Sequence, residues 1–194
     1  MRVTPFAALW LGFVSLASAQ VRQPVSAPKA MVVSREPHAT DAGLRVLQAG
    51  GNAVDAAVAV GFALAVTHPA AGNLGGGGFM LIRFADGRTT FLDFRERAPE
   101  KATRDMYLGL DGQTTEESLT GWRAPAVPGT VRGFEYASKK YGRKKWAELL
   151  APAVELAAQG FPVSWGLAQS LRGAKKLAQF PESKRIFLRG GLFY

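Results

Sequence analysis

The chain has 194 residues, of which 47% are hydrophobic and 20% charged, as is typical of a folded protein rather than a disordered one. It contains no cysteine and two histidines, so disulfides, thiol chemistry and a metal centre built from several histidines are excluded. Its net charge of +9 would suit a polyanion, but the basic residues gather late in the chain with aromatics at helical spacing, and we interpret them as a solvated basic face.

Residues 1–19 have the pattern of a secretory signal peptide. Arg2 supplies the positive start, an apolar stretch follows, and a small-residue A-x-A site ends at Ala19. The apolar stretch is too short to span a bilayer comfortably, which disfavours a membrane anchor. We therefore expect cleavage near Ala19 and Gln20, a secreted or periplasmic location, and a mature chain without a membrane span. An exported protein seldom meets nucleic acid, so no nucleic-acid partner is expected.

The mature chain is expected to begin with a polar, proline-bearing leader at 20–29 and a short buried strand at 30–34. A polar stripe predicts a helix at 38–49, ended by two glycines. Asn52 is a good N-cap for a second helix at 53–66, and Asp55 lies three residues later near the positive end of that helix. The helix is apolar around its whole circumference. That helix is therefore predicted to be a central core helix, buried on all sides.

Two β-rich runs at 79–84 and 89–96 are separated by Asp86-Gly87, the kind of dipeptide that most strongly signals a short hairpin. The first run is apolar on both faces apart from Arg83, so we expect its sheet to be covered on both sides. The predicted architecture is layered and of the α+β class, with an antiparallel sheet and helices packed on it.

The second half of the chain is predicted to be mainly helical. Residues 100–129 contain turns and little periodicity, and helices are predicted at 130–141, 146–159 and 164–179. Pro152 could break the second of these helices, and Gly160 is expected to end it. The stretch 185–194 has a strand-like apolar run and a Gly-Gly turn before it stops, which suggests a hairpin without its second strand and hence a truncated chain.

Four consecutive glycines, Gly75 to Gly78, stand directly before the first β-rich run. A phosphate-binding loop follows a strand and opens a helix, whereas here a helix precedes the glycines and a strand follows them. The lysine and hydroxyl of a nucleotide-binding loop are also missing from this stretch. We therefore expect a crossing from helix to strand at which two backbones pass closely, because glycine leaves room for such an approach.

Neither histidine has a catalytic setting that the sequence can identify. His68 ends the buried helix, and the sequence fixes no nucleophile or carboxylate near it, while His38 lies on a polar helix stripe. A structural role is favoured for both. The sequence also has no G-x-S-x-G motif and no serine arrangement that suggests a triad.

Arg95 is the candidate binding residue. It lies near the end of the second β-rich run among apolar neighbours, and an unpaired buried charge is costly, so it needs an anion. A guanidinium can bind a carboxylate through two parallel hydrogen bonds, which lysine cannot do. The alternative is a structural salt bridge with Asp93 or Glu96, and the residues alone leave both interpretations open.

The succession of motifs resembles the amino-terminal part of the gamma-glutamyltranspeptidases, or glutathione hydrolases, from about residue 30 to residue 188. The stretches that carry the resemblance are GGNAVDAAVAVGFALAVTHPAAGNLGGGGFMLIRF, FLDFRERAPEKATRDMY, VPGTVRGFEYASKKYG and PAVELAAQGF. The resemblance implies an N-terminal nucleophile hydrolase fold, a four-layer αββα sandwich. Residues 30–194 would be an incomplete, N-terminal portion of the large subunit.

The resemblance also implies an activity. In this family an inactive precursor cuts itself into two subunits, and the threonine that begins the small subunit attacks γ-glutamyl compounds such as glutathione. The γ-glutamyl group then passes to water or to an acceptor amino acid or peptide, with no cofactor and no metal. The arginine of the family's D-F-R-E motif binds the α-carboxylate of the glutamyl group, and it corresponds to Arg95.

The family's nucleophile lies in a Thr-Thr-His-x-Ser-like motif that has no match here. No catalytic residue is therefore assigned in this chain, its small subunit is expected to be missing, and the 194 residues by themselves are expected to be inactive. Two alternatives remain open. One is a related acylase of the same superfamily, which the D-F-R-E match disfavours, and the other is a non-catalytic remnant.

Overall fold

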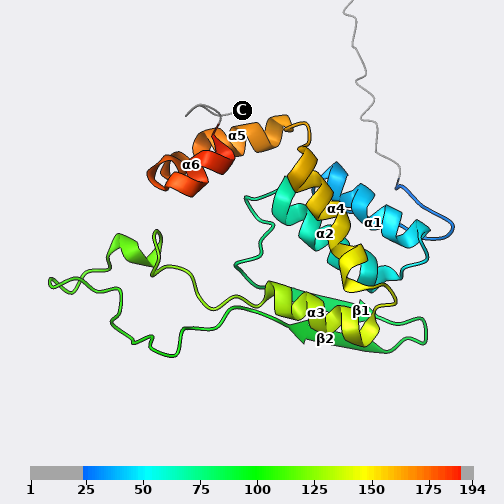
Figure 1. Ribbon diagram of the computed structural model, residues 1–194. Helices are drawn as coiled ribbons and strands as arrows, with labels where there is room; N and C mark the ends of the chain where they lie inside the picture. Colours follow the sequence, from blue (N-terminus) through cyan, green and yellow to red (C-terminus); the bar gives the residue numbers. More distant parts are fainter. Residues whose placement is uncertain (1–23, 189–194) are drawn as a thin grey trace, which may run out of the picture.

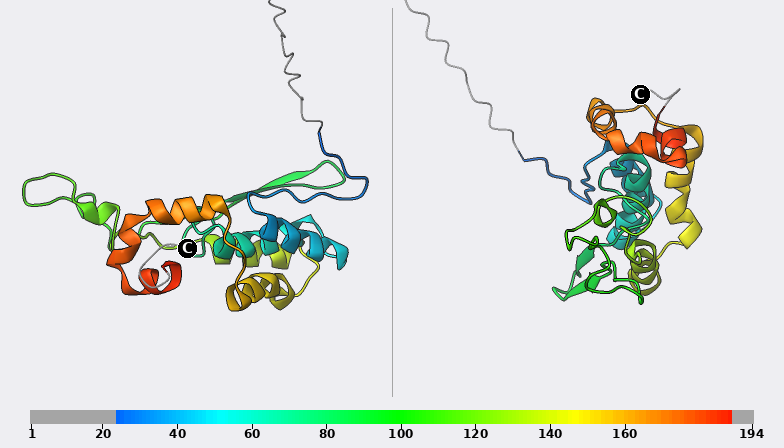
Figure 2. Two further views of the ribbon diagram at one scale, coloured as in Figure 1. Left: turned by 90° about the horizontal axis from the view of Figure 1, so that it is seen from above. Right: turned by 90° about the vertical axis from the view of Figure 1, so that its left-hand side faces the viewer.

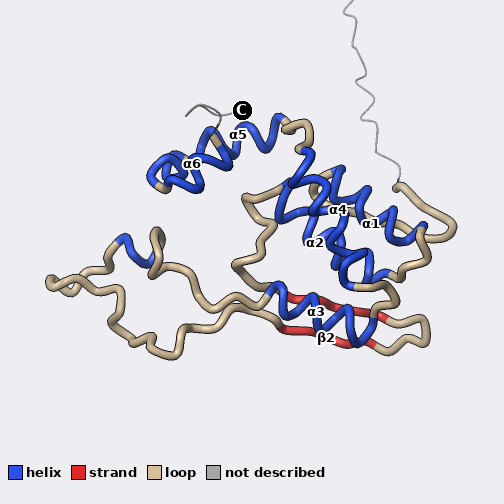
Figure 3. Tube along the Cα trace, viewed as in Figure 1, coloured by secondary structure: helices blue, strands red, loops and turns tan. Residues whose placement is uncertain are grey.

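The computed structural model describes residues 24–188, so the predicted signal peptide and the last six residues lie outside the described part of the chain. The elements in chain order are α1 (Pro37–Gln48), α2 (Ala53–Thr67), β1 (Phe79–Arg83), β2 (Thr89–Asp93), the 3-10 turn η1 (Glu116–Ser118), α3 (Thr130–Tyr141), α4 (Trp146–Gln159), α5 (Trp165–Gly173), the 3-10 turn η2 (Lys175–Gln179) and α6 (Pro181–Phe187). The fold is thus a mixture of helices with a small antiparallel hairpin, and a long loop between β2 and α3 projects away from both (Figures 1 and 3).

Helix α2 begins with a reciprocal cap. The side-chain oxygen of Asn52 accepts the N–H groups of Val54 and Asp55, and the Asp55 carboxylate accepts the Asn52 N–H. Such a capping box satisfies backbone donors that the first helical turn leaves without partners. Of the side chains along α2, only Ala53 and Ala57 are exposed, which confirms the predicted central helix.

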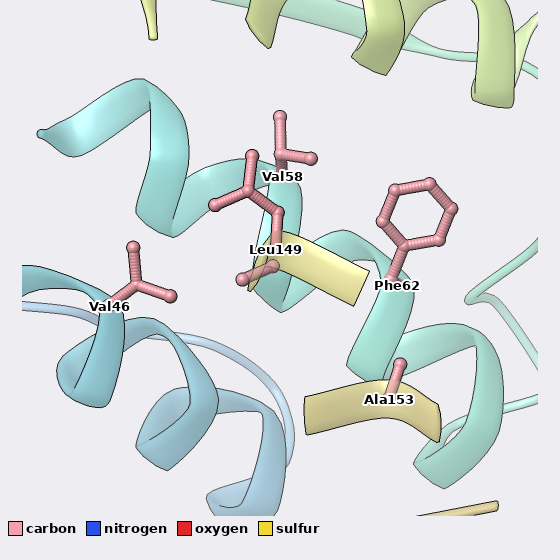
Figure 4. Packing of buried hydrophobic residues seen from close by; sticks show 6 residues of the cluster. Val46, Val58, Phe62, Leu149 and Ala153 are labelled. Carbon is pink, nitrogen blue, oxygen red and sulfur yellow. The ribbon is translucent and has the colours of Figure 1, made fainter. Parts of the chain in front are cut away.

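The hydrophobic core lies where α2 meets α1 and α4 (Figure 4). Its central side chains are Val46, Val58, Phe62, Leu149 and Ala153. Val58 and Leu149 have no exposed surface. Burying a side chain of this size stabilises a fold by about 1.5–3 kcal/mol, so this three-helix contact is the main source of stability that the described residues show.

The hairpin has the turn that Asp86-Gly87 predicts. Strands β1 and β2 pair in antiparallel register, with Phe79 opposite Asp93 and Arg83 opposite Thr89. Gly87 has a φ of 87°, in the left-handed region that glycine occupies without strain. The turn chemistry therefore determines both the place and the register of this sheet.

The two faces of the hairpin differ. Met80 packs against the core cluster, whereas Phe79, Leu81 and Phe91 point the other way and are more than half exposed. The expectation of a sheet covered on both sides is wrong for the described part of the chain. Its helices lie on one side of the hairpin, so strand alternation leaves the other face uncovered (Figure 2).

Two predicted strands are not strands. Residues 30–34 have no regular secondary structure, no strand among residues 24–188 pairs with them, and Val33 is 82% exposed. The apolar run that begins at 185 is helical up to Phe187, where α6 ends, and the predicted Gly-Gly turn at 190–191 lies outside the described residues. A proline at the start of α6, Glu182 in its first turn and basic residues in its last turn all favour a helix there.

The other predicted helices are confirmed. Helices α3 and α4 have the predicted bounds, and α5 with η2 occupies the region predicted at 164–179. Pro152 lies inside α4 without ending it, so the break that it could have caused does not occur. Helix α4 ends instead at Gly160, whose φ of 77° takes the chain out of the helix.

Candidate functional site

The glycine loop, Gly75–Gly78, crosses from α2 to β1 in close contact with the start of α3. The Gly76 carbonyl accepts the N–H groups of Gly129 and Thr130 at 2.8 and 3.1 Å. The Asn73 side-chain oxygen accepts the Gly76 N–H at 3.0 Å and the Thr130 hydroxyl at 2.6 Å. The predicted close passage of two backbones is thus confirmed, and the partner of the loop is the beginning of α3.

The other side of the glycine loop lies against the segment that carries Arg95. Gly78 and Phe94 exchange backbone hydrogen bonds, which continues the hairpin beyond β2. A side chain at Gly77 would place its Cβ 2.7 Å from the Glu96 nitrogen and from the Phe94 carbonyl oxygen. Real Cβ atoms do not approach backbone atoms so closely, so this position requires glycine. The loop therefore sets where residues 94–96 lie.

Arg95 lies at the surface, on the uncovered face of the hairpin. Its side chain is 62% exposed, its Nε donates to Glu96 Oε2 at 3.0 Å, and its Cζ lies 5.7 Å from the centre of the Phe79 ring. The expectation that Arg95 is a buried charge is wrong, because the face on which it stands is uncovered. The salt bridge with Glu96 is present, whereas Asp93 accepts the backbone N–H of Arg95 at 2.9 Å.

The carboxylate of Glu96 is stabilised in its charged form. Its own backbone N–H lowers the pKa of Glu96 most, the hydrogen bond from Arg95 lowers it further, and the Gly77 N–H adds to the same effect. The pKa lies below the ordinary glutamate value of 4.5. At neutral pH Glu96 is therefore a charged partner that holds the Nε edge of the Arg95 guanidinium.

A groove of about 480 Å³ lies beside Arg95, between β2 and α3. Arg95, Arg97, Arg132 and Asp93 contribute its charged side chains, so the groove is predominantly positive. Arg132 is already paired with Glu135 at 2.7 Å. A larger groove of about 840 Å³ opens between α3 and the start of α4, away from Arg95, and it contains neither histidine.

The two histidines have no catalytic neighbours within residues 24–188. His38 contacts the Phe161 ring edge-on, with 5.7 Å between ring centres, and the backbone N–H of His68 donates to Leu64 at the end of α2. No group of three His, Asp or Glu side chains in the described residues could hold a metal ion. In the same part of the chain, no helix combines the length and the apolar character that crossing a membrane requires.

Sequence reasoning identified Arg95 and its possible partner Glu96, but it missed Asn73 and Thr130. An asparagine just before a glycine run, and a threonine after Pro-Gly at a helix start, were the local signals that could have drawn attention to them. Nothing local indicates that these two side chains meet, because 57 positions separate them along the chain.

Comparison with known proteins decides the family. A family model described as gamma-glutamyltranspeptidase matches residues 39–194. The chain belongs to this family. The resemblance that its motifs indicated is thereby confirmed.

Relatives of the chain include a glutathione hydrolase proenzyme from Pseudomonas sp. strain A14, which is 57% identical over 144 residues, or 74% of this chain and 25% of that protein. An acylase ACY 1 proenzyme from Pseudomonas sp. strain V22 is 40% identical over 178 residues, or 88% of this chain and 32% of that protein. The crystal structure of Helicobacter pylori gamma-glutamyltranspeptidase has a TM-score of 0.85 and 47% identity, over 88% of this chain and 50% of that chain. The chain thus spans about a quarter to a third of the length of the two proenzymes.

Proposed function

We propose that Arg95 of this gamma-glutamyltranspeptidase family chain binds the α-carboxylate of a γ-glutamyl substrate such as glutathione. The observation that carries the proposal is the exposed guanidinium of Arg95, whose Nε donates a hydrogen bond to Glu96 Oε2 at 3.0 Å and so fixes one edge of the group. Because the bond to Glu96 uses Nε, the Nη groups can donate two parallel hydrogen bonds to a carboxylate. Asp93 bonds the backbone of Arg95 and so leaves this edge of the guanidinium to the substrate.

The reaction that we propose for the complete protein is acyl transfer through a covalent intermediate. A threonine hydroxyl, from a segment that this sequence does not contain, attacks the γ-carbonyl, and the α-amine of that threonine takes the hydroxyl proton. The amide C–N bond breaks, the amine leaves with the proton, and a γ-glutamyl ester forms. Water or the amine of an acceptor amino acid or peptide then takes the γ-glutamyl group. Arg95 orients the substrate, and the chain by itself supplies no nucleophile.

We further propose that the hairpin belongs to one sheet of an αββα sandwich. The alternation along β1 and β2 supports this, because helices cover one face while Phe79, Leu81 and Phe91 on the other face are exposed. A second sheet, partly supplied by the small subunit of the precursor, would cover that face and bring the nucleophile toward Arg95. Residues 30–194 would then be an N-terminal portion of the large subunit.

Export is also part of the proposal. The pattern at 1–19 supports cleavage between Ala19 and Gln20, and a secreted or periplasmic mature protein whose leader runs over residues 20–29. N-terminal sequencing of exported material checks this point. Material that is exported with Met1 still attached would contradict it.

An acylase of the same family that uses another acyl group is the second candidate, and the similarity to an acylase proenzyme favours keeping it. The two candidates differ in the α-carboxylate. A 4-aminobutyryl amide is a γ-glutamyl amide without that carboxylate, so it separates an enzyme that needs Arg95 from one that does not. A non-catalytic remnant is the third candidate and would process neither substrate.

The test uses a chimera in which the matched segment of the Pseudomonas sp. strain A14 proenzyme is replaced by that of this chain. Arg95→Lys keeps the charge but loses the planar pair of donors, so we expect KM for γ-glutamyl-p-nitroanilide to rise about 10- to 150-fold, for a loss of about 1.5–3 kcal/mol. Self-cleavage should survive, and kcat should change little.

The matched control is Arg83→Lys, which alters an exposed arginine on the neighbouring strand and should leave KM unchanged. The same chimera should prefer γ-glutamyl-p-nitroanilide to 4-aminobutyryl-p-nitroanilide, and Arg95→Lys should reduce that preference. Equal kcat/KM for both substrates would favour the acylase. Unchanged kinetics in Arg95→Lys would contradict the role of Arg95.

A further inference from the structure

We propose that Thr130 and Asn73 are positioning residues for Arg95, and that they act through the glycine loop. The inference deepens the proposed function, since the importance of a fixed Arg95 rests on its role as the carboxylate ligand. The geometry itself does not depend on that role. It consists of a continuous set of contacts from the start of α3, through residues 73–78, to residues 94–96.

The first contact is a hydrogen bond from the buried Thr130 hydroxyl to the side-chain amide oxygen of Asn73. Thr130 is 3% exposed, and its Oγ1 donates to Asn73 Oδ1 at 2.6 Å. The same oxygen accepts the Gly76 N–H at 3.0 Å. One side-chain oxygen thus joins the first residue of α3 to the second glycine of the loop. Without the hydroxyl, the amide of Asn73 would lose one of its two anchors.

The second contact ties the backbone of the loop to the same helix end. Gly129, which precedes α3, has no side chain with which to cap the helix, and its N–H and that of Thr130 both donate to the Gly76 carbonyl. A Cβ at Gly129 would overlap the carbonyl oxygen of Phe94. The helix start, the glycine loop and the strand that leads to Arg95 therefore pack backbone against backbone, and none of them can shift without the others.

The third contact passes from the loop to Arg95. Gly77 lies against residues 94–96 so closely that a Cβ would meet the Glu96 nitrogen at 2.7 Å. The Glu96 side chain is 29% exposed and accepts from Arg95 Nε at 3.0 Å. A loop that moves would carry the backbone of Glu96 with it and loosen the guanidinium. Within the described residues, the side-chain interactions of the exposed Arg95 are the salt bridge with Glu96 and the contact with the Phe79 ring.

A purely structural role for Thr130 is the competing explanation. In that case the loss of its hydroxyl would lower stability, as at any buried threonine, without a specific effect on Arg95. Thr67 offers the matched control, because it is 1% exposed and its hydroxyl donates to the Ala63 carbonyl at 3.0 Å. Thr67 belongs to α2 and takes no part in the contacts of the glycine loop.

The experiment measures hydrogen exchange of the Arg95 Nε–H in the ¹⁵N-labelled chain, with the signal assigned by its loss in Arg95→Lys. In Thr130→Val, which keeps the shape and removes the hydroxyl, we expect exchange roughly fivefold faster or more, the factor for one lost hydrogen bond. Thr130→Ser should restore the rate to within about twofold. Thr67→Val should lower Tm to a similar extent as Thr130→Val and leave the Arg95 signal unchanged.

Asn73→Ala provides a second route to the same answer if Thr130→Val folds poorly. It should accelerate exchange at least as much as Thr130→Val, because it removes the Thr130 bond and the Gly76 bond together. The double variant should exchange no faster than Asn73→Ala alone, because that single variant already removes the Thr130 bond. Unchanged exchange in Thr130→Val and Asn73→Ala would overturn the proposal, as would equal acceleration in Thr67→Val. The chimera kinetics test the role of Arg95 separately, so failure of one proposal does not imply failure of the other.

Discussion

The Asp55 carboxylate accepts the backbone N–H of Arg143 at 3.0 and 3.1 Å, across 88 positions of sequence. The same carboxylate accepts the N–H groups of Lys144 and Asn52, and Asp55 is completely buried. One charged group thus joins the start of α2 to the turn between α3 and α4. That turn connects the helix that contacts the glycine loop with a helix of the core.

We expect Asp55→Asn to lower the free energy of unfolding by about 2–4 kcal/mol. The amide keeps one oxygen but turns an NH₂ group toward backbone N–H donors, and it removes the charge that strengthens these bonds. Urea unfolding of both chains measures the effect, and Asp86→Asn in the exposed hairpin turn is the control. A loss below about 0.5 kcal/mol would show that Asp55 does not hold these elements together.

The pH dependence of the Arg95 pair follows from Glu96. The pKa of Glu96 is lower in the folded chain than its unfolded value of 4.5. The pair with Arg95 therefore stabilises the fold at pH values above 4.5, and this stabilisation is lost as the pH falls through the folded-state pKa of Glu96. We expect the ¹³C signal of the Glu96 carboxyl to titrate with a midpoint below 4.5. In Arg95→Ala the midpoint should rise but stay below 4.5, because the backbone N–H of Glu96 is the larger cause. A wild-type midpoint at or above this value would contradict the pairing.

The uncovered face of the hairpin should make the isolated chain self-associate. Phe79, Leu81 and Phe91 form an exposed apolar patch beside open strand edges, a combination that favours aggregation. Leu81→Thr keeps a residue that suits a strand and should reduce association in sedimentation velocity. Val33→Thr is the control, because Val33 is similarly exposed but lies outside the sheet. Equal association in wild type and Leu81→Thr would argue against this face.

The chain alone should release no p-nitroaniline from γ-glutamyl-p-nitroanilide. Acyl transfer needs a nucleophile, a base and an oxyanion site within hydrogen-bond reach of one another, and we assign only the carboxylate ligand to this chain. The chimera described above serves as the positive control. Turnover by the chain that exceeds a buffer blank and disappears in Arg95→Ala would reveal a nucleophile among its own 194 residues.

Sequence alone determined the features that depend on neighbours along the chain. Asn52 and Asp55 predicted the start of α2, Asp86-Gly87 predicted the hairpin, and Gly160 predicted the end of α4. Each of these signals acts within about four residues, through a side chain that caps a helix or a glycine that adopts a left-handed angle. The D-F-R-E motif likewise pointed to Arg95 and to Glu96 beside it.

Tertiary structure decided what depends on partners far along the chain. The run at 30–34 was predicted to be a strand, but the described residues contain no strand that pairs with it. Arg95 was predicted to be buried, but it lies on a face of the hairpin that no described helix covers. The meeting of Thr130 with Asn73 follows from the packing of α3 on the glycine loop. Pairing and burial are properties of surfaces brought together by the whole fold, so a local pattern can indicate which residues suit them but not whether the partner is there.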